Sequence, residues 1–506
     1  MLRRFAIHWA PALLLVLLLT GAASATPVEW ATKVDPWVLD RLAGEGEAEM
    51  LVVLVEQADL GAAARLGSNE AKGRFVYERL TEVATRSQRP VLRQLEALGL
   101  EHRAYWIVNM IWVRGDEEAV VALASRSDVQ RIHANPSVRL ATPSAAPARA
   151  PQGIEQSIDH VGAPDLWAAG FTGQGTVIAG ADTGYAWQHP ALQGKYRGWD
   201  GANADHDYNW HDAIHSGGGS CGADSSEPCD DLGHGTHTMG TMVGDDGAGN
   251  QIGMAPGARW IGCRNMDQGN GTPTTYSECF QFFLAPTDLA GENPRPDLAP
   301  DVVNGSWSCP VSEGCTDPNV LLSVVQNVRA AGIVVVQSAG NDGPSCSSVD
   351  TPAAIYAPTF TVGAVDNNDM IVGFSSRGPV TIDGSDRLKP DVTAPGMGIR
   401  SSLPPSGYGQ LSGTSMSAPH VAGLVALVVS AQPCLRGFPH AIERHILETV
   451  VPRTTTEDCG GVDGDEVPNN TYGHGAIRAV VPTTCPQIFE DGFESGDTSA
   501  WSAVVP

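Results

Sequence analysis

The sequence predicts an α/β protein in which a parallel β-sheet is flanked by helices and preceded by a small α+β unit. After about residue 150, apolar runs typical of strands buried on both faces alternate with helical segments and glycine-rich loops. This order favours a parallel sheet with helices on both faces. Before residue 150, three strand-like segments are interleaved with two helical ones. Charge and cysteine content both change between the two parts.

The 506-residue chain carries a net charge of −26, which is unevenly distributed. Residues 1–150 hold 17 Lys and Arg against 17 Asp and Glu, whereas residues 151–506 hold 14 against 40. All ten cysteines also follow residue 150. Both shifts meet near PSAAPARAPQG, residues 143–153, which we interpret as the linker between a first domain at 26–150 and a second at 151–484. The acidic balance argues against a nucleic-acid partner.

The first 25 residues are interpreted as a secretory signal peptide. The basic start MLRRFAIHW is followed by the apolar run APALLLVLLLTG and by the small residues Ala-Ser-Ala that end at Ala25, which is the order expected before a cleavage site. A membrane anchor is the alternative, but the apolar run is shorter than the roughly 20 residues that span a bilayer. We therefore expect a secreted protein in which no later segment is apolar enough to span a membrane.

The ten cysteines of an exported chain indicate disulfide bonds. The sequence alone leaves their connectivity open. Cysteines that lie close together in the chain are plausible partners: Cys221 with Cys229, Cys263 with Cys279, and Cys309 with Cys315.

The first domain is expected to be a small α+β unit of roughly 100 residues. Its expected elements are a strand at 49–56, a helix at 72–98, a buried strand at 103–115, a capped helix at 116–128 and a final strand at 129–140. The unit contains no cysteine and shows no obvious chemistry of its own.

The second domain is expected to hold five buried strands, at 176–182, 258–264, 300–306, 333–340 and 359–366. Helices are expected from near His234 and at 319–332, 415–432 and 440–450. The tail at 485–506 has four acids, no base and little periodicity. We interpret it as a disordered end, with a sorting or processing signal as the alternative.

Four polar residues stand where a parallel sheet collects functional groups, beyond the carboxyl ends of its strands. Asp182 closes one expected strand and Asn341 follows another, His234 lies in the glycine-flanked DLGHGTHTMGT, and Ser415 heads a helix. Amide hydrolysis needs a nucleophile, a base and donors for the oxyanion. Ser415 suits the first role and His234 the second, while Asp182 would fix the imidazole.

The expected oxyanion hole combines the backbone N–H of Ser415 with the side-chain amide of Asn341. A helix start offers unpaired N–H groups and the positive end of the helix dipole where negative charge develops. We expect Pro419 to lie in the first turn of this helix, where a missing N–H costs no hydrogen bond.

The order Asp, His, Ser together with the segments ADTG, HGTHTMGT, SAGN and GTSMSAPHVAG resembles the subtilisin-like (subtilase) serine proteases. VVNGSWS, FSSRGP and KPDVTAPG also match, and the resemblance covers about residues 155–480. Stretches such as HPALQGKYRGW, QIGMAPGARWIG and YGHGAIRAV are similar to one branch, the bacillopeptidase F type. The first domain is similar to subtilase propeptides, which act as folding chaperones and inhibitors.

The resemblance implies a subtilisin-like fold behind a ferredoxin-like propeptide, and a secreted endopeptidase made as a zymogen. It assigns the triad to Asp182, His234 and Ser415 and the oxyanion role to Asn341. It implies that Ser306, Trp307 and Ser308 pair with extended substrate, and that Ser338, Ala339 and Gly340 wall the primary specificity pocket. Trp307 replaces a smaller apolar residue that is usual in the family.

The expected partners are protein or peptide substrates and the chain's own propeptide, and we expect a monomer that cuts itself between about 140 and 155. The chemistry requires no cofactor. Structural calcium is common in the family, and the sequence assigns no ligands to it. The acids at 200, 205, 207 and 212 suit a solvated loop better than a cation site. The purpose of the acidic insert at 203–231 does not follow from the sequence.

Each residue also has a plain structural interpretation. Ser415 alone could be a helix N-cap, Asp182 a turn residue and Asn341 a C-cap. His234 and His237 could be metal ligands in a metallohydrolase. The alternative function is a catalytically silent binding or surface protein on a subtilase scaffold. Against it, the chain retains all three triad residues and Asn341.

Overall fold

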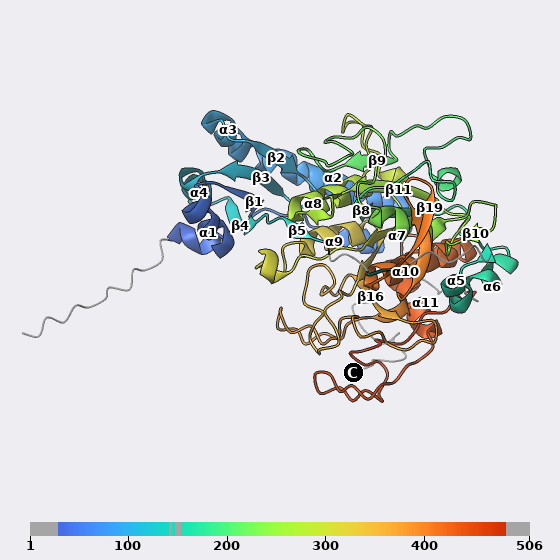
Figure 1. Ribbon diagram of the computed structural model, residues 1–506. Coiled ribbons are helices and arrows are strands. Elements are labelled where there is room, and N and C mark those ends of the chain that lie inside the picture. Colours follow the sequence, from blue (N-terminus) through green and yellow to red (C-terminus); the bar gives the residue numbers. More distant parts are fainter. Residues whose placement is uncertain (1–28, 141–143, 147–152, 482–506) are drawn as a thin grey trace, which may run out of the picture.

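The computed structural model describes residues 29–140, 144–146 and 153–481 (Figure 1). An N-terminal region up to residue 140 packs against a larger body that begins at residue 153. The expected signal peptide at 1–25 and the acidic tail at 485–506 lie outside the described residues, as does most of the expected linker.

The N-terminal region is a four-stranded antiparallel sheet with spatial order β2-β3-β1-β4, which confirms the expected α+β, ferredoxin-like unit. The strands are β1 (Ala48–Leu54), β2 (His102–Tyr105), β3 (Met110–Gly115) and β4 (Val129–Ala134). The helices are α1 (Pro36–Glu45), α2 (Asn69–Ser87), α3 (Arg89–Leu98) and α4 (Glu117–Ala124). The sheet and three of these helices enclose a separate apolar core.

Three sequence predictions for this region were wrong in detail. The helix expected at 72–98 is broken at Gln88, because Pro90 cannot donate the N–H that a continuous helix needs. The strand expected at 103–115 is the β2–β3 hairpin. The final strand expected at 129–140 ends at Ala134, before Pro136, and the chain resumes as β5 (Val138–Arg139) on the larger body.

The larger body is built on a seven-stranded parallel sheet, as the sequence predicted. In spatial order the strands are β17 (Val392–Pro395), β16 (Phe360–Val365), β15 (Val334–Ser338), β14 (Val302–Gly305), β8 (Val177–Asp182), β11 (Arg259–Arg264) and β9 (Trp210–Asp212). The five expected strands are confirmed. The two edge strands were missed, since one has only three residues and the other ends in a proline.

Helices cover both faces of this sheet and create two apolar cores. The helices are α5 (Gln156–Val161), α6 (Ala163–Ala168), α7 (His234–Val243), α8 (Pro273–Leu284), α9 (Leu322–Ala330), α10 (Thr414–Ala431) and α11 (Pro439–Thr449). Successive strand residues alternate between the cores: Val302 of β14 packs with α7 and α10, and Val303 packs with α8 and α9. Each strand is therefore buried on both sides.

Short strand pairs complete the fold. They are β7 (Gly153–Ile154) with β10 (Asn250–Gln251), β12 (Met266–Asp267) with β13 (Asn270–Gly271) and β5, and β18 (Ile399–Leu403) with β19 (Gly407–Ser412) and β6 (Ser144–Ala146). Two of these groups join chain from before residue 150 to the larger body.

The central helix α10 corrects one expectation. Within the described ranges it is the single helix long and apolar enough to cross a membrane, although the sequence had suggested that no later segment was. Of its apolar window, 89% is buried inside the protein, and it packs against β14, β15, β16 and β17. Its apolar composition is therefore that of a core helix.

Disulfides brace the larger body, and the three expected pairs are confirmed: Cys221–Cys229, Cys263–Cys279 and Cys309–Cys315. A fourth disulfide, Cys346–Cys459, joins segments 113 residues apart. Cys434 is also disulfide-bonded.

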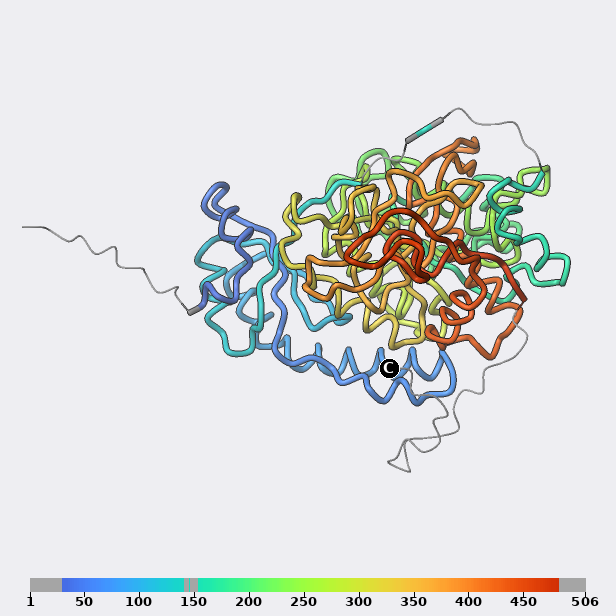
Figure 2. The backbone as a smooth tube through the Cα atoms, turned by 90° about the horizontal axis from the view of Figure 1, so that it is seen from below, coloured from blue at the N-terminus to red at the C-terminus, as the bar shows by residue number. Residues whose placement is uncertain are grey.

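The N-terminal region docks on α8 and α9 through its β2–β3 turn and through α2, which runs along the larger body in Figure 2. The side-chain oxygen of Gln281 accepts hydrogen bonds from the backbone N–H groups of Trp106 (2.8 Å) and Ile107 (3.1 Å). Tyr105 donates its hydroxyl to the buried Glu278 at 2.6 Å. Lys72 of α2 donates to the Gly437 carbonyl at 2.7 Å.

Candidate active site

Asp182 and His234 form a buried pair at the carboxyl end of the sheet. Asp182 is the last residue of β8, and His234 is the first residue of α7. The Nδ1 atom of His234 lies 2.7 Å from Oδ1 of Asp182, and the two side chains are 2% and 1% exposed. Nε2 of His234 is buried and has no hydrogen-bond partner among the described residues. That nitrogen is thus left to accept a proton.

The carboxylate of Asp182 is held by further donors on both oxygens. The backbone N–H of Thr183 donates to Oδ1 at 2.8 Å. The hydroxyl of Thr238, one turn along α7, lies 3.2 Å from Oδ2. Since a buried carboxylate is costly unless its lone pairs are satisfied, these bonds offset the cost of burying Asp182 and hold its carboxylate toward the imidazole. Sequence reasoning did not single out Thr238.

Ser415 is the second residue of α10 and is 3% exposed. Pro419 lies inside this helix rather than in its first turn, so the sequence expectation was wrong. A proline at this position leaves the carbonyl of Ser415, four residues earlier, without a helical donor. The hydroxyl of Ser306 lies 3.3 Å from that carbonyl and takes the place of the missing N–H. Ser306 thereby fixes the start of α10.

Asn341 is positioned by Thr414, the residue before Ser415. The backbone N–H of Thr414 donates to Oδ1 of Asn341 at 2.9 Å, and the Thr414 hydroxyl lies 3.1 Å from the same oxygen. With its oxygen accepting these bonds, the NH₂ group is the donor end of the side-chain amide. Gly340 precedes it with φ = +104°, a left-handed conformation that favours glycine.

Comparison with known proteins shows which family the chain belongs to. A model of the subtilase family matches residues 173–475. The chain belongs to the subtilase family. It is 36% identical to bacillopeptidase F from Bacillus subtilis (strain 168) over 428 residues, which are 80% of this chain and 28% of that relative.

Two shorter relatives come from the same organism. Subtilisin E is 30% identical over 317 residues, 62% of this chain and 71% of that relative. Serine protease AprX is 31% identical over 340 residues, 61% of this chain and 66% of that relative. The subtilase described here therefore spans only 28% of the length of bacillopeptidase F but most of the length of the shorter proteases.

The predicted substrate strand of this subtilase follows β14. Trp307 is 2% exposed and stacks on Tyr276 of α8, with ring centroids 4.0 Å apart. Its carbonyl accepts a hydrogen bond from the side chain of Gln337 at 2.5 Å, and the carbonyl of Ser308 lies 3.4 Å from the Tyr276 hydroxyl. The carbonyl groups of Trp307 and Ser308 are thus engaged within the protein.

The predicted pocket wall lies beside Asn341. Ser338 ends β15, and the N–H of Ala339 donates to the Val362 carbonyl at 3.0 Å. The N–H of Gly340 lies 3.2 Å from the Thr414 hydroxyl. These contacts bring the wall residues to the start of α10.

Chain from before residue 150 crosses this part of the subtilase, a contact that the sequence analysis missed. Strand β5 pairs antiparallel with β13, and the N–H of Leu140 donates to the Gly269 carbonyl at 2.7 Å. Strand β6 pairs antiparallel with β19, and β19 ends at Ser412, three residues before Ser415. The first pairing lies beside Leu232, two residues before His234, and the second ends three residues before Ser415.

The described residues contain no group of three or more His, Cys, Asp or Glu side chains suited to a metal ion. Asp212 forms a two-pronged ion pair with the buried Arg264. His237 lies 3.0 Å from the Ile399 carbonyl, and burial, aided by nearby His234, lowers its pKa to about 3. His237 is thus hydrogen-bonded to the backbone, and both the metallohydrolase alternative and structural calcium stay predictions.

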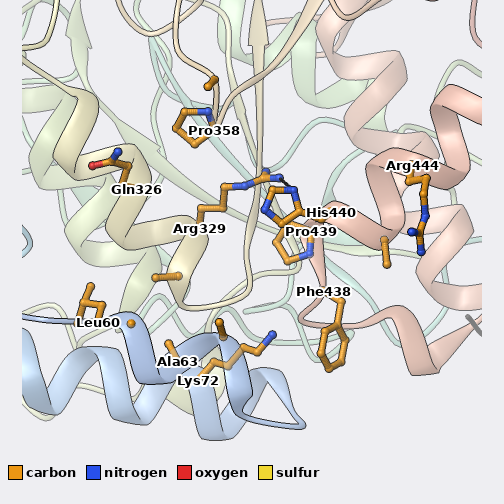
Figure 3. Close-up of a pocket in the computed structure, with 15 residues that line it drawn as sticks. Leu60, Ala63, Lys72, Gln326, Arg329, Pro358, Phe438, Pro439, His440 and Arg444 are labelled. Atoms are coloured by element: carbon orange, nitrogen blue, oxygen red, sulfur yellow. Dashed lines mark hydrogen bonds between the residues drawn. The ribbon is translucent and has the colours of Figure 1, made fainter. Parts of the chain in front are cut away.

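A cavity of about 640 Å³ lies elsewhere, between the N-terminal region and the larger body (Figure 3). Lys72 of α2, Arg329 of α9 and Phe438 beside α11 line it, with small apolar residues between them. None of the proposed triad residues lines this cavity, so it is separate from the site described above.

Proposed function

We propose that this chain is a secreted serine endopeptidase that hydrolyses peptide bonds with Ser415, His234 and Asp182. The observation that carries the proposal is the buried 2.7 Å contact between Asp182 and His234, which leaves Nε2 of the imidazole free. The four disulfides of the larger body, together with the disulfide-bonded Cys434, support an oxidising compartment and hence secretion.

In the proposed reaction, the Ser415 hydroxyl attacks the carbonyl carbon of the scissile amide while Nε2 of His234 takes its proton. Asp182 stabilises the resulting imidazolium and holds its Nδ1–H. The oxyanion receives hydrogen bonds from the Ser415 N–H and the Asn341 amide. His234 then gives its proton to the leaving amine. In the second half, water attacks the acyl carbon while His234 takes its proton, and His234 returns that proton to the Ser415 oxygen as the acyl group leaves.

We further propose that the N-terminal region is a propeptide that inhibits the site until the chain is cut between about 140 and 155. The pairing of β5 with β13 and of β6 with β19 supports this, because both strands pair with segments that lie close to His234 or Ser415. The docking of Tyr105 and Ile107 on α8 holds the region there.

The test is covalent labelling with a fluorophosphonate probe, applied to protein that was purified as the full chain and then allowed to process. Ser415→Ala, treated in the same way, is the control for labelling at other residues. We expect one adduct, mapped by mass spectrometry to Ser415 and absent from the control. A processed, folded protein that takes up no probe would contradict the proposal and favour the catalytically silent scaffold. Ser415→Ala should also stay uncut in pure protein, and processing of that variant at the wild-type rate would refute self-cleavage.

A further inference from the structure

The carboxylate of Asp230 gathers more hydrogen bonds than the proposed catalytic residues themselves do. Its Oδ1 accepts from the hydroxyl of Thr183 (2.9 Å) and from the backbone N–H groups of Leu232 (3.1 Å) and Gly233 (2.7 Å). Its Oδ2 accepts from the backbone N–H (2.9 Å) and the hydroxyl (2.5 Å) of Thr236. One carboxylate therefore receives five donors.

These donors lie at the end of β8 and at the start of α7, the two elements that carry Asp182 and His234. Thr183 follows Asp182 directly and donates its own N–H to that carboxylate. Thr236 lies in the first turn of α7, two residues after His234. The Thr183 hydroxyl also accepts the N–H of Gly235 at 3.0 Å. Asp230 thus ties the end of β8 to the start of α7 through bonds that include no atom of the triad.

The spacing between these two elements is tight. A Cβ atom on Gly235 would lie 2.2 Å from the carbonyl oxygen of Gly184 and 3.0 Å from Cβ of Asp182. A small shift of α7 away from β8 would therefore lengthen the contact between Asp182 and His234, and a misplacement of about 1 Å can cost about 100-fold in rate.

Asp230 is itself anchored by the acidic insert. The preceding residue, Cys229, is closed onto Cys221 by a disulfide, and its carbonyl accepts the N–H of Tyr185 at 3.1 Å. Arg264 is fully buried and contacts the insert at two points. It pairs with Asp212 and donates to the Gly218 carbonyl at 3.2 Å. The insert therefore delivers one carboxylate to a fixed place beside the site.

We propose that Asp230 is a positioning residue that sets the Asp182–His234 contact by clamping β8 to α7, an inference that rests on the proposed function. It gives the insert a purpose that its sequence did not reveal: the disulfide loop and Arg264 hold Asp230 in register with Thr183 and Thr236.

The test compares Asp230→Asn with Asp288→Asn, each made as the full chain and assayed after processing. Asp288 is a matched control because its carboxylate also caps loop N–H groups, those of Ala290 and Glu292, in a loop after α8 that carries no proposed site residue. We expect Asp230→Asn to lower kcat about 10- to 100-fold with KM changed less than threefold, and to slow fluorophosphonate labelling by a similar factor. Asp288→Asn should stay within twofold of wild type.

A second pair keeps the inference testable if Asp230→Asn fails to fold. Thr183→Val removes the hydroxyl that links Asp230 to Gly235, whereas Thr183→Ser keeps it. We expect the valine variant to lose kcat about 10-fold and the serine variant to recover most of it. The Asp230→Asn and Thr183→Val losses should also be strongly non-additive, since they break one network.

Two results separate the failure of this inference from failure of the proposed function. Full kcat in Asp230→Asn or Thr183→Val, with Ser415→Ala inactive, would overturn the positioning role and leave the protease standing. Activity that survives Ser415→Ala would overturn both. Equal losses in Thr183→Val and Thr183→Ser would also count against the clamp, because the hydroxyl would then not matter.

Discussion

Lowering the pH from 7.5 to 5.0 should destabilise the folded protein by about 4 kcal/mol through two buried histidines. His237 and His420 are fully buried. Burial lowers the pKa of His237 to about 3 and that of His420 to about 4, whereas the pKa of an unfolded histidine is about 6.5. Both folded values lie below the unfolded one, so the neutral side chains contribute full stability above about pH 6.5 and lose it as the pH falls.

The magnitude follows from the protons that only the unfolded chain binds. At pH 5.0 an unfolded histidine is almost fully protonated while the folded His237 and His420 stay neutral, which amounts to about 2 kcal/mol for each residue. The loss continues toward pH 4 for His420 and pH 3 for His237. Nearby carbonyls do not prevent it: the 3.0 Å contact of His237 with Ile399 and the 2.8 Å contact of His420 with Met416 each engage one ring nitrogen only.

Chemical denaturation of the full chain, followed by tryptophan fluorescence, measures this effect. The Ser415→Ala background prevents self-digestion. His237→Gln and His420→Asn each remove the titration while keeping an amide donor for the same carbonyl. The double variant should lose about 4 kcal/mol less stability than its parent between pH 7.5 and 5.0. Equal pH dependence in the parent and the double variant would refute the reasoning.

Three further outcomes are expected. Thr238→Val removes the hydroxyl beside Oδ2 of Asp182 and should lower kcat/KM about 10-fold, from about 1.5 kcal/mol for a bond to a charged group, with Thr238→Ser near wild type in steady-state kinetics. Replacing Cys346 and Cys459 by serine opens a 113-residue loop and should lower the free energy of unfolding by up to about 5 kcal/mol in chemical denaturation. Trp307→Ala removes the ring that stacks on Tyr276 of α8 and should lower the free energy of unfolding by about 3–5 kcal/mol in the same assay. A loss below about 1 kcal/mol would show that this stacked pair contributes little to stability.

The proposed triad could be found in the sequence because each residue lies in a long segment with its own pattern. The structure adds what depends on contacts between distant segments. Strand β5 has two residues and finds its partner β13 about 130 positions later, so no local periodicity reveals it. Pro419 was predicted to lie in the first turn of its helix, where it would cost no hydrogen bond. It lies inside α10 because that helix begins at Thr414. The stacking of Trp307 on Tyr276 likewise joins two separate elements.

The N-terminal region is held to the larger body by contacts with α8, α9 and the Gly437 carbonyl, all made by residues that precede the proposed cut. Cleavage between about 140 and 155 would leave those contacts intact. It would only turn a tethered partner at high effective concentration into a free one. The cut alone would therefore leave the fragment bound. Activity should appear with a lag that shortens on dilution, and the moment of activation would be set by how fast the fragment dissociates.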